Sequence, residues 1–315
     1  MEIRKAEEKD IPGIIQVLKA SLGETDLPVS EDVWRYKHVA NPFGPSIVLV
    51  AEEANKIVGV RAFMRWQWQL QATSYCALRA VDTATHPNFQ GKGIFKKLTL
   101  KALEEAEKNG DNFVFNTPNE QSRPGYLKMG WEQVDNVEVG LRPAFNSFWK
   151  LGRIELAYNQ EIITTEEKIE NLCERWNTKL AHEKKLFTPK SREYLYWRYE
   201  KNQLQSYEVY AEENIYLAAY VKRRGKLREL RVAECIYLNS AAEVAKIKRI
   251  IRKMSWRFGV QFCSFSPELL SLNFTNKGKF GPMLTFREIY IEKNLKGKLL
   301  QIENWNSSIG DLELF

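Results

Sequence analysis

The sequence predicts an α/β (α+β) protein that is built from two similar domains in tandem. β-rich segments alternate along the chain with segments that carry apolar residues at helical spacing. The length of 315 residues suits about two domains. A stretch of the first half, Ser46 to Glu53, also resembles a stretch about 160 residues later, Ser206 to Glu213. Self-similarity at a domain-sized distance favours a duplication.

Composition excludes several classes of protein. Hydrophobic residues make up 44% and charged residues 28%, a balance that supports a buried core. No apolar run approaches the roughly 20 residues that span a bilayer, and the charged N-terminus lacks a secretory signal, so we expect a cytoplasmic protein without membrane insertion. The four cysteines and three histidines lack metal-ligand spacing, so no metal is expected.

The net charge of +7 comes from dispersed basic residues. They are densest at Lys222–Arg224 and between Lys248 and Lys253. We interpret these stretches as solvated faces rather than a nucleic-acid site, since nearly as many acidic residues are interspersed. We expect no nucleic-acid partner and leave the oligomeric state open.

In the first half, periodicity and turn residues predict strands and helices that lead to a glycine-containing loop. The loop follows the turn at His86–Asn88, and its helix ends at Asn109-Gly110, a typical C-cap. The expected strands cover 2–6, 46–51, 57–70, 74–85 and 112–116, and the expected helices 9–21, 31–39, 95–108 and 121–129.

The pattern then restarts, which places a domain boundary at residue 146 and predicts domains 1–146 and 147–315. An aromatic helix with arginine precedes each copy of the repeated stretch, Trp34-Arg35-Tyr36 in one and Trp197-Arg198-Tyr199 in the other. The expected helices of the second half cover 166–184, 193–199 and 241–257, the strands cover 207–212, 215–223 and 229–238, and short β segments follow to the end.

The loop after the strand at 74–85 has the composition of a phosphate-binding loop. It reads Gln90, Gly91, Lys92, Gly93, Ile94, Phe95, and a helix follows at once. Backbone N–H groups at a helix N-terminus bind phosphate well, and glycine lets the ligand approach them closely. The second half has Asn239 to Glu243 at the corresponding place, with a carboxylate and no glycine. We therefore expect one pyrophosphate site, in the first half.

Two ordered motifs resemble the GNAT acyltransferase superfamily. The first, Arg/Gln-x-x-Gly-x-Gly/Ala, is matched by Gln90, Gly93 and Phe95, where Phe95 departs from the usual small residue. The second, Asn-x-x-Ala-x-x-Phe-Tyr-x-x-x-Gly-Phe, is matched by Asn119, Ser122, Gly125, Tyr126, Gly130 and Trp131. The resemblance implies two tandem GNAT-like domains with mixed, mostly antiparallel sheets flanked by helices. It makes 1–146 the acyl-CoA-binding catalytic domain and 147–315 a degenerate copy on the acceptor side.

The resemblance also implies roles for residues. In this superfamily a β-bulge separates two parallel strands, here 74–85 and 112–116, and the acyl-pantetheine arm lies between them. Backbone groups of Val81 and Thr83 would bind the arm, the loop from Gln90 to Phe95 the pyrophosphate, and Asn119 the coenzyme. Tyr126 would be the general acid that protonates the departing thiolate.

The general base stays open. Asp82 lies in the right strand, although a salt-bridged role is equally compatible with its position. His86 is better interpreted as a turn residue. The terminal carboxylate of Phe315 is the other candidate, because several tandem-GNAT families use the chain terminus at the active site.

The expected function is transfer of an acetyl group from acetyl-CoA, as co-substrate, to a primary amine of a small molecule or peptide by direct attack. Two alternatives remain: a longer acyl donor, or a non-catalytic sensor that binds acyl-CoA or another ligand. Peptidyl transfer, as in Fem-type tandem folds, is disfavoured because those proteins do not rely on a coenzyme A loop.

Overall fold

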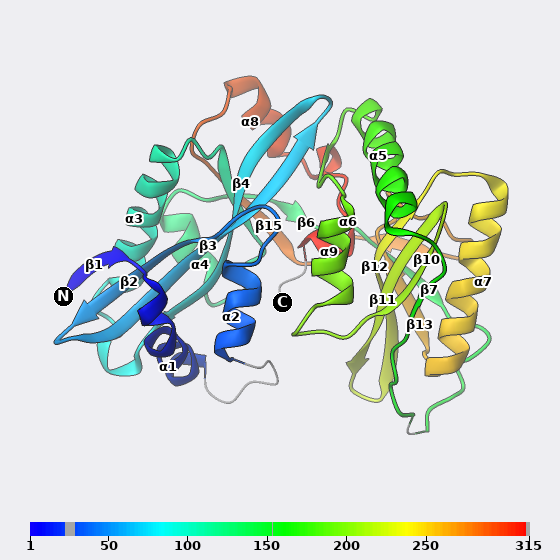
Figure 1. The fold of residues 1–315 in the computed structure, drawn as a ribbon, viewed down its shortest axis with the longest axis horizontal. Helices are drawn as coiled ribbons and strands as arrows, with labels where there is room; N and C mark the ends of the chain where they lie inside the picture. Colours follow the sequence, from blue (N-terminus) through cyan, green and yellow to red (C-terminus); the bar gives the residue numbers. More distant parts are fainter. Residues whose placement is uncertain (23–28, 153, 313–315) are drawn as a thin grey trace.

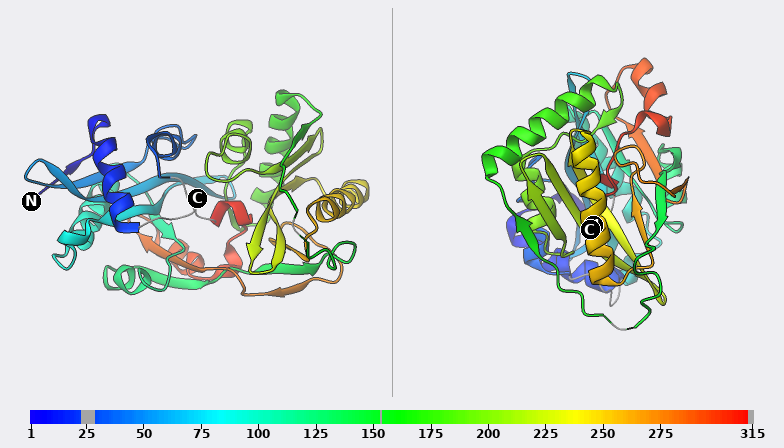
Figure 2. Two further views of the ribbon diagram at one scale, coloured as in Figure 1. Left: turned by 90° about the horizontal axis from the view of Figure 1, so that it is seen from below. Right: turned by 90° about the vertical axis from the view of Figure 1, so that its right-hand side faces the viewer.

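Two mixed β-sheets, each flanked by helices, lie side by side in the computed structural model (Figure 1). The structure describes residues 1–22, 29–152 and 154–312. The predicted fold class is confirmed, since most strand pairs in both sheets are antiparallel. Figure 2 shows the two halves along the long axis, with the N-terminus at one end.

The first sheet contains six strands of the first half, five of them at the expected places, together with two strands of the second half. Its single parallel pair among the described strands joins β4 to β5. Strand β9 (Leu186–Phe187) pairs with the end of β3. In spatial order the sheet contains β1 (Glu2–Lys5), β2 (Ile47–Glu53), β3 (Lys56–Leu70), β4 (Thr73–Thr85), β5 (Phe113–Asn116), β15 (Met283–Glu288) and β6 (Glu132–Asn136).

The second sheet repeats this plan with strands of the second half and one strand of the first half. In spatial order it contains β14 (Asn276–Gly278), β7 (Val139–Pro143), β13 (Phe262–Phe265), β12 (Leu227–Tyr237), β11 (Ile215–Arg224), β10 (Glu208–Glu212) and β8 (Gln160–Ile162).

The helices are α1 (Ile11–Leu22), α2 (Glu31–His38), α3 (Ile94–Lys108), α4 (Arg123–Lys128), α5 (Glu166–His182), α6 (Arg192–Leu195), α7 (Ala241–Phe258), α8 (Lys293–Leu299) and α9 (Ile309–Leu312). Alternate residues of β3 serve opposite faces of the first sheet, as the pleat requires. Val60 and Met64 pack in one cluster with Ile14 of α1, whereas Phe63 packs in another with Leu98 of α3.

Apart from the short β9, each half places one strand in the sheet of the other half. Strand β7 follows β6 in the chain but pairs with β13 and β14 of the second sheet. Strand β15 follows β14 but pairs with β5 and β6 of the first sheet. The boundary at residue 146 stays a prediction, and this exchange means that sheet membership does not follow it. Each sheet is therefore completed by the other half of the chain.

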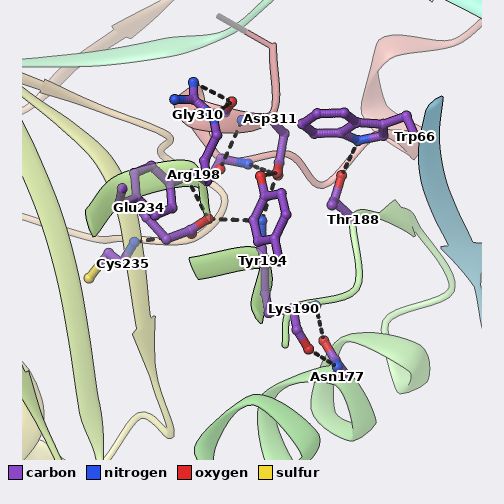
Figure 3. A network of polar contacts seen from close by, with 12 residues as sticks. Trp66, Asn177, Thr188, Lys190, Tyr194, Arg198, Glu234, Cys235, Gly310 and Asp311 are labelled. Atoms are coloured by element: carbon purple, nitrogen blue, oxygen red, sulfur yellow. Dashed lines mark hydrogen bonds and ion pairs between the residues drawn. The ribbon is translucent and has the colours of Figure 1, made fainter. Parts of the chain in front are cut away.

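A buried charge cluster joins the second half to the C-terminal helix (Figure 3). The ammonium of Lys190 lies 2.8 Å from a carboxylate oxygen of Glu234 and 2.7 Å from one of Asp311. Tyr194 also donates to Asp311, and Arg198 donates to the carbonyl of Gly310. Burial opposes the charged form of Lys190, but the two carboxylates outweigh it and raise its pKa. This cluster fixes α9 between the two sheets.

The prediction of short β segments up to the end of the chain is wrong for its last part. Helices α8 and α9 follow β15 there, with a 3₁₀ turn at Ile302–Asn304 between them. Ser308 and Asp311 cap α9 reciprocally, because each side chain accepts a hydrogen bond from the backbone N–H of the other. A helix of four residues has too short a pattern to be recognised by periodicity.

We predict that Lys190→Met lowers the free energy of unfolding by about 3 to 5 kcal/mol, because it leaves two buried carboxylates without their cation. Urea denaturation followed by circular dichroism measures this. The matched control is Lys101→Met, whose ammonium pairs with Glu104 on the surface and whose loss should cost at most about 1 kcal/mol. Equal, small losses in both variants would contradict a role for the cluster in stability.

Candidate functional site

Strand β4 contains one inserted residue close to the point where it separates from β5. Along β3 and β4, Arg61 pairs with Thr83 and Ala62 with Val81, so Asp82 is the extra residue of a β-bulge. Its φ of 37° lies in the left-handed region. The parallel ladder with β5 stops at Arg79. Beyond that point, within the described residues, the β5 side of β4 has no strand partner, and Val81 and Thr83 lie in this stretch.

The glycine loop leads from β4 into α3. Gly91 and Gly93 have φ values of 76° and 72°, which favour glycine, and Gly93 is the N-cap of α3. The first intrahelical hydrogen bond runs from the N–H of Lys97 to the carbonyl of Gly93. The backbone N–H groups of residues 94 to 96 therefore precede the helical ladder, and the loop before them is exposed. This arrangement suits an anionic group.

The side-chain amide of Gln90 donates a hydrogen bond to the carbonyl of Thr85, the last residue of β4, and so ties the loop to the end of that strand. Lys92 places its ammonium 4.6 Å from the centre of the Phe89 ring. His86 lies in the turn before the loop, where its ring nitrogen accepts from the N–H of Asn88.

Phe95, the residue that departs from the family motif, packs against a second departure. A Cβ atom at Gly125 would lie 3.2 Å from the Phe95 ring, so a larger residue at 125 would collide with it. The family motif has phenylalanine at 125 and a small residue at 95. The two positions have exchanged large for small, and the Phe95 ring fills space that a side chain at 125 would occupy.

Tyr126 lies on α4 with its hydroxyl buried under the sheet. Its ring packs edge-on against Phe95, with centroids 5.7 Å apart, and its side chain is 3% exposed. Arg61 of β3 donates a hydrogen bond of 2.8 Å to the hydroxyl oxygen. An oxygen that accepts from arginine keeps its own O–H free to donate elsewhere.

Arg61 is the functional candidate that sequence reasoning missed. It is fully buried, and its Nε and Nη2 atoms have no hydrogen-bond partner among the described residues. Its guanidinium lies near the rings of Phe63, Phe95 and Tyr126. The signal in the sequence was a lone arginine in the apolar part of 57–64. A buried cation with unsatisfied donors is costly and is typical of a functional site.

Asn119 shapes the turn before α4. Its side-chain oxygen accepts from the N–H of Ser122 at 2.9 Å and from its hydroxyl at 2.8 Å. The residue is exposed. Its role toward a coenzyme therefore stays a prediction that concerns the amide NH₂ group.

Asp82 is engaged by two side chains of α2. Its Oδ2 lies 2.5 Å from the ammonium of Lys37 and 2.8 Å from Nε2 of His38, whose other ring nitrogen contacts Ser46. Burial would raise the pKa of Asp82, but Lys37 and His38 outweigh it and hold that pKa well below its usual range. Burial also lowers the pKa of His38 more than Asp82 raises it. The salt-bridged alternative thus describes Asp82 in this structure.

The C-terminal segment reaches the end of β5. Arg79 donates to the backbone carbonyls of Asp311 and Leu312, and the Thr117 hydroxyl lies 3.4 Å from the Leu312 carbonyl. Phe315, the other predicted base, lies outside the described residues. The last described residue is thus next to the separated strands.

The second sheet has the same bulge but different surroundings. The pairing of β11 with β12 skips Ala233. Helix α9 occupies this place, where a Cβ at Gly310 would lie 3.1 Å from the Ala233 carbonyl. At the start of α7, Glu243 accepts from the N–H of Leu238 and Ser240 and forms a capping box with Ser240. A carboxylate therefore stands where the first half has its glycine loop.

The described residues contain no group of three or more histidine, cysteine, aspartate or glutamate side chains that could hold a metal ion. No helix in that part of the chain is long and apolar enough to cross a membrane.

We predict that Phe95 and Gly125 are coupled. Phe95→Ala and Gly125→Phe should each lower the free energy of unfolding by about 1 to 3 kcal/mol, through a cavity and through overpacking. The double variant should lose less than the sum by about 1 kcal/mol, because the new ring fills the vacated space. Urea denaturation of the four proteins gives the coupling energy, and additive losses would contradict the exchange.

Comparison with known proteins agrees with this geometry. Residues 2–134 match the family model described as acetyltransferase (GNAT) domain. No curated protein matches the chain. A probable N-acyltransferase from Enterococcus faecalis has a similar fold, with a TM-score of 0.66 and 11% identity over 91% of this chain and 72% of that one.

Two further solved structures are described as GCN5-related N-acetyltransferases. The one from Anabaena variabilis has a TM-score of 0.64 and 15% identity over 92% of this chain and 73% of that one. The one from Kribbella flavida has a TM-score of 0.63 and 15% identity over 91% and 71%. At this identity the structures show a shared fold, and the family match lies in the first half. The comparisons thus show that residues 2–134 are similar to GNAT acetyltransferase domains and that the whole chain shares its fold with these structures.

Proposed function

We propose that the protein transfers an acetyl group from acetyl-CoA to a primary amine of a small molecule or peptide. The observation that carries this proposal is the interrupted ladder between β4 and β5, which adjoins both the glycine loop and the buried Tyr126 hydroxyl. A strand edge without a partner can bind an extended chain of amides, and the helix start can bind its phosphates. Acyl-pantetheine with its pyrophosphate combines these two chemistries.

In this proposal backbone groups make most of the contacts with the coenzyme. Backbone groups of Val81 and Thr83 would bind the pantetheine amides. The N–H groups from Gly91 to Lys96 would bind the pyrophosphate, with the charge of Lys92 nearby. The side-chain amide of Asn119 would add a contact.

The chemistry would be direct attack. The neutral amine forms a C–N bond to the thioester carbonyl, and the C–S bond then breaks. The acylated nitrogen loses its extra proton to a base, and the leaving thiolate takes the hydroxyl proton of Tyr126, which is afterwards replaced from the base or from water. The hydrogen bond from Arg61 supports this role, since it leaves the Tyr126 proton free to point at the sulfur. The cation of Arg61 would also stabilise the negative charge that develops in the transition state.

The terminal carboxylate of Phe315 is the better-supported base. Asp82 is held by Lys37 and His38, and its depressed pKa makes it a weak proton acceptor. Three residues separate Leu312, which is beside Thr117, from the terminus. Because three extended residues span at most about 10 Å, the terminal carboxylate has to lie within about that distance of Leu312.

The proposed location is the cytoplasm, because free cysteines such as the four here are typical of reducing compartments.

We predict that Tyr126→Phe and Arg61→Met each lower kcat about a hundredfold while the KM for acetyl-CoA changes little, because both groups act on charge that develops in the transition state. Thiol release against a panel of primary amines measures this. Arg61→Lys should recover part of the rate, because it restores a cation. Arg61→Met should also keep or raise the unfolding free energy, because it removes an unpaired buried charge.

Calorimetry with acetyl-CoA completes this test. Binding without turnover of any amine would favour the sensor, and tighter binding of longer acyl-CoA would favour a longer donor. Loss of stability in Arg61→Met with unchanged kcat would show that Arg61 is structural.

We predict that one glycine added after Phe315 lowers kcat at least tenfold, because the terminal carboxylate would be displaced from the amine. The control adds one glycine before Met1, which should leave kcat unchanged. Equal kinetics for both extended proteins and the wild type would exclude the terminus as the base.

A further inference from the structure

Six exposed, large apolar side chains gather at one end of the second half. They come from three separate parts of the sequence, and each is 50–77% exposed. The rings form two groups of contacts: Phe145 packs against Phe274, and Trp149 packs against both Phe148 and Trp256. This group is called the aromatic tip and consists of Phe145, Phe148, Trp149, Leu151, Trp256 and Phe274.

The aromatic tip lies on the turn after β7 and at the C-terminal end of α7 (Figure 1, lower right). In Figure 2, left, this end of the molecule is the one far from the N-terminus. It is therefore remote from the glycine loop and does not belong to the site described above.

The backbone below the aromatic tip is held firmly, so the rings are displayed by an ordered turn. Ser147 donates from its hydroxyl to the Val260 carbonyl, and Asn146 donates to the Arg252 carbonyl. Arg228 donates to the carbonyls of Lys150 and Gly152. Hydrogen bonds of this number fix the turn but bury none of its large rings.

Phe274 is also held in an exposed position. It is 77% exposed and has a φ of 59°, a conformation that bulky residues rarely adopt. A folded chain gains nothing by holding such a ring in water, which points to a surface that covers it.

Basic side chains adjoin the aromatic tip along α7. Lys248, Arg252 and Trp256 are four residues apart and so form one row on the helix, with Arg249 beside it. Lys248, Arg249 and Arg252 are exposed, and no side-chain hydrogen bond or ion pair engages them among the described residues. Glu155 is the only acidic residue between Pro143 and Asn159. Glu161, Glu208 and Glu212 also reach this helix, but their carboxylates pair with Lys253, Arg257 and Lys246 rather than with the basic row.

We propose that the aromatic tip docks on an anionic lipid bilayer, with its rings at the headgroup level and the basic row on the lipid phosphates. Trp and Phe prefer this interface, and adjoining Lys and Arg bind anionic headgroups. The charge of the surface and its aromatic character thus both fit one partner.

Two other partners fit less well. A second copy of the chain, bound through the same surface, would bring two unpaired basic rows together. Single-stranded nucleic acid needs free ring faces on which bases stack. Here the rings meet edge to face, and the ammonium of Lys150 lies 3.3 Å from the centre of the Trp256 ring. The Lys150 ammonium thus occupies one face of Trp256, the ring that lies in line with the basic row.

The test is sedimentation of the full chain with vesicles of phosphatidylcholine alone or of phosphatidylcholine mixed equally with phosphatidylglycerol. The proposal expects binding to the mixed vesicles only, weakened by salt. Lys248→Gln/Arg252→Gln should weaken it more than tenfold, at about fivefold for each cation. Phe148→Ser/Trp149→Ser should abolish it, whereas the control Tyr290→Ser, an exposed aromatic at another place, should not.

All variants change exposed side chains, so circular dichroism melting curves should coincide and confirm folding. Absence of binding to mixed vesicles, or binding that the Phe148→Ser/Trp149→Ser variant retains, overturns the proposal. The Phe148→Ser/Trp149→Ser variant also tests the two other partners. If it loses self-association in light scattering, or loses binding to an oligonucleotide, but still binds vesicles, the proposal is overturned. Acetyl transfer to a soluble amine is measured separately, so failure of the proposed reaction leaves this test intact.

Discussion

The inserted residue Asp82 is the constraint on which the site depends. A bulge disrupts the strand pairing locally, and this one lies just beyond Arg79 and Phe115, the last residues at which β4 and β5 pair. Lys37 and His38 of α2 hold the Asp82 carboxylate and thereby stabilise a backbone conformation that non-glycine residues rarely adopt. The free edge of β4 and the end of the described C-terminal segment lie near this interruption, and the glycine loop follows β4 in the chain.

The second sheet has a bulge at the corresponding place, but there a helix packs against it. Its β12 skips Ala233 as β4 skips Asp82, but α9 packs there and the buried cluster around Lys190 holds α9 in place. The second sheet and the buried cluster thus hold α9, and with it Leu312, beside Arg79 of β4. The exchange of β7 and β15 joins the halves further, since each sheet lacks a strand without the other.

Much of the fold and part of the site could be predicted because the signals are local. The glycine loop, its helix and the Asn119 to Trp131 motif are contiguous in sequence, and the repeat placed corresponding strands about one domain apart. The exchange of β7 and β15 was not predictable, because both strands read as ordinary β segments and partner choice is a long-range matter. The departure at Phe95 gained a reason only when the structure placed it against Gly125. Arg61 and the aromatic tip depend on contacts between distant segments, which no local pattern carries.

A crystal structure of the protein with coenzyme A would test the central claim most directly. The account predicts the pyrophosphate on the backbone N–H groups between Gly91 and Lys96, the pantetheine arm along Val81 and Thr83, and the sulfur within hydrogen-bond reach of the Tyr126 hydroxyl. Coenzyme bound between β12 and β13, or a sulfur remote from Tyr126 with β4 and β5 unchanged, would contradict it.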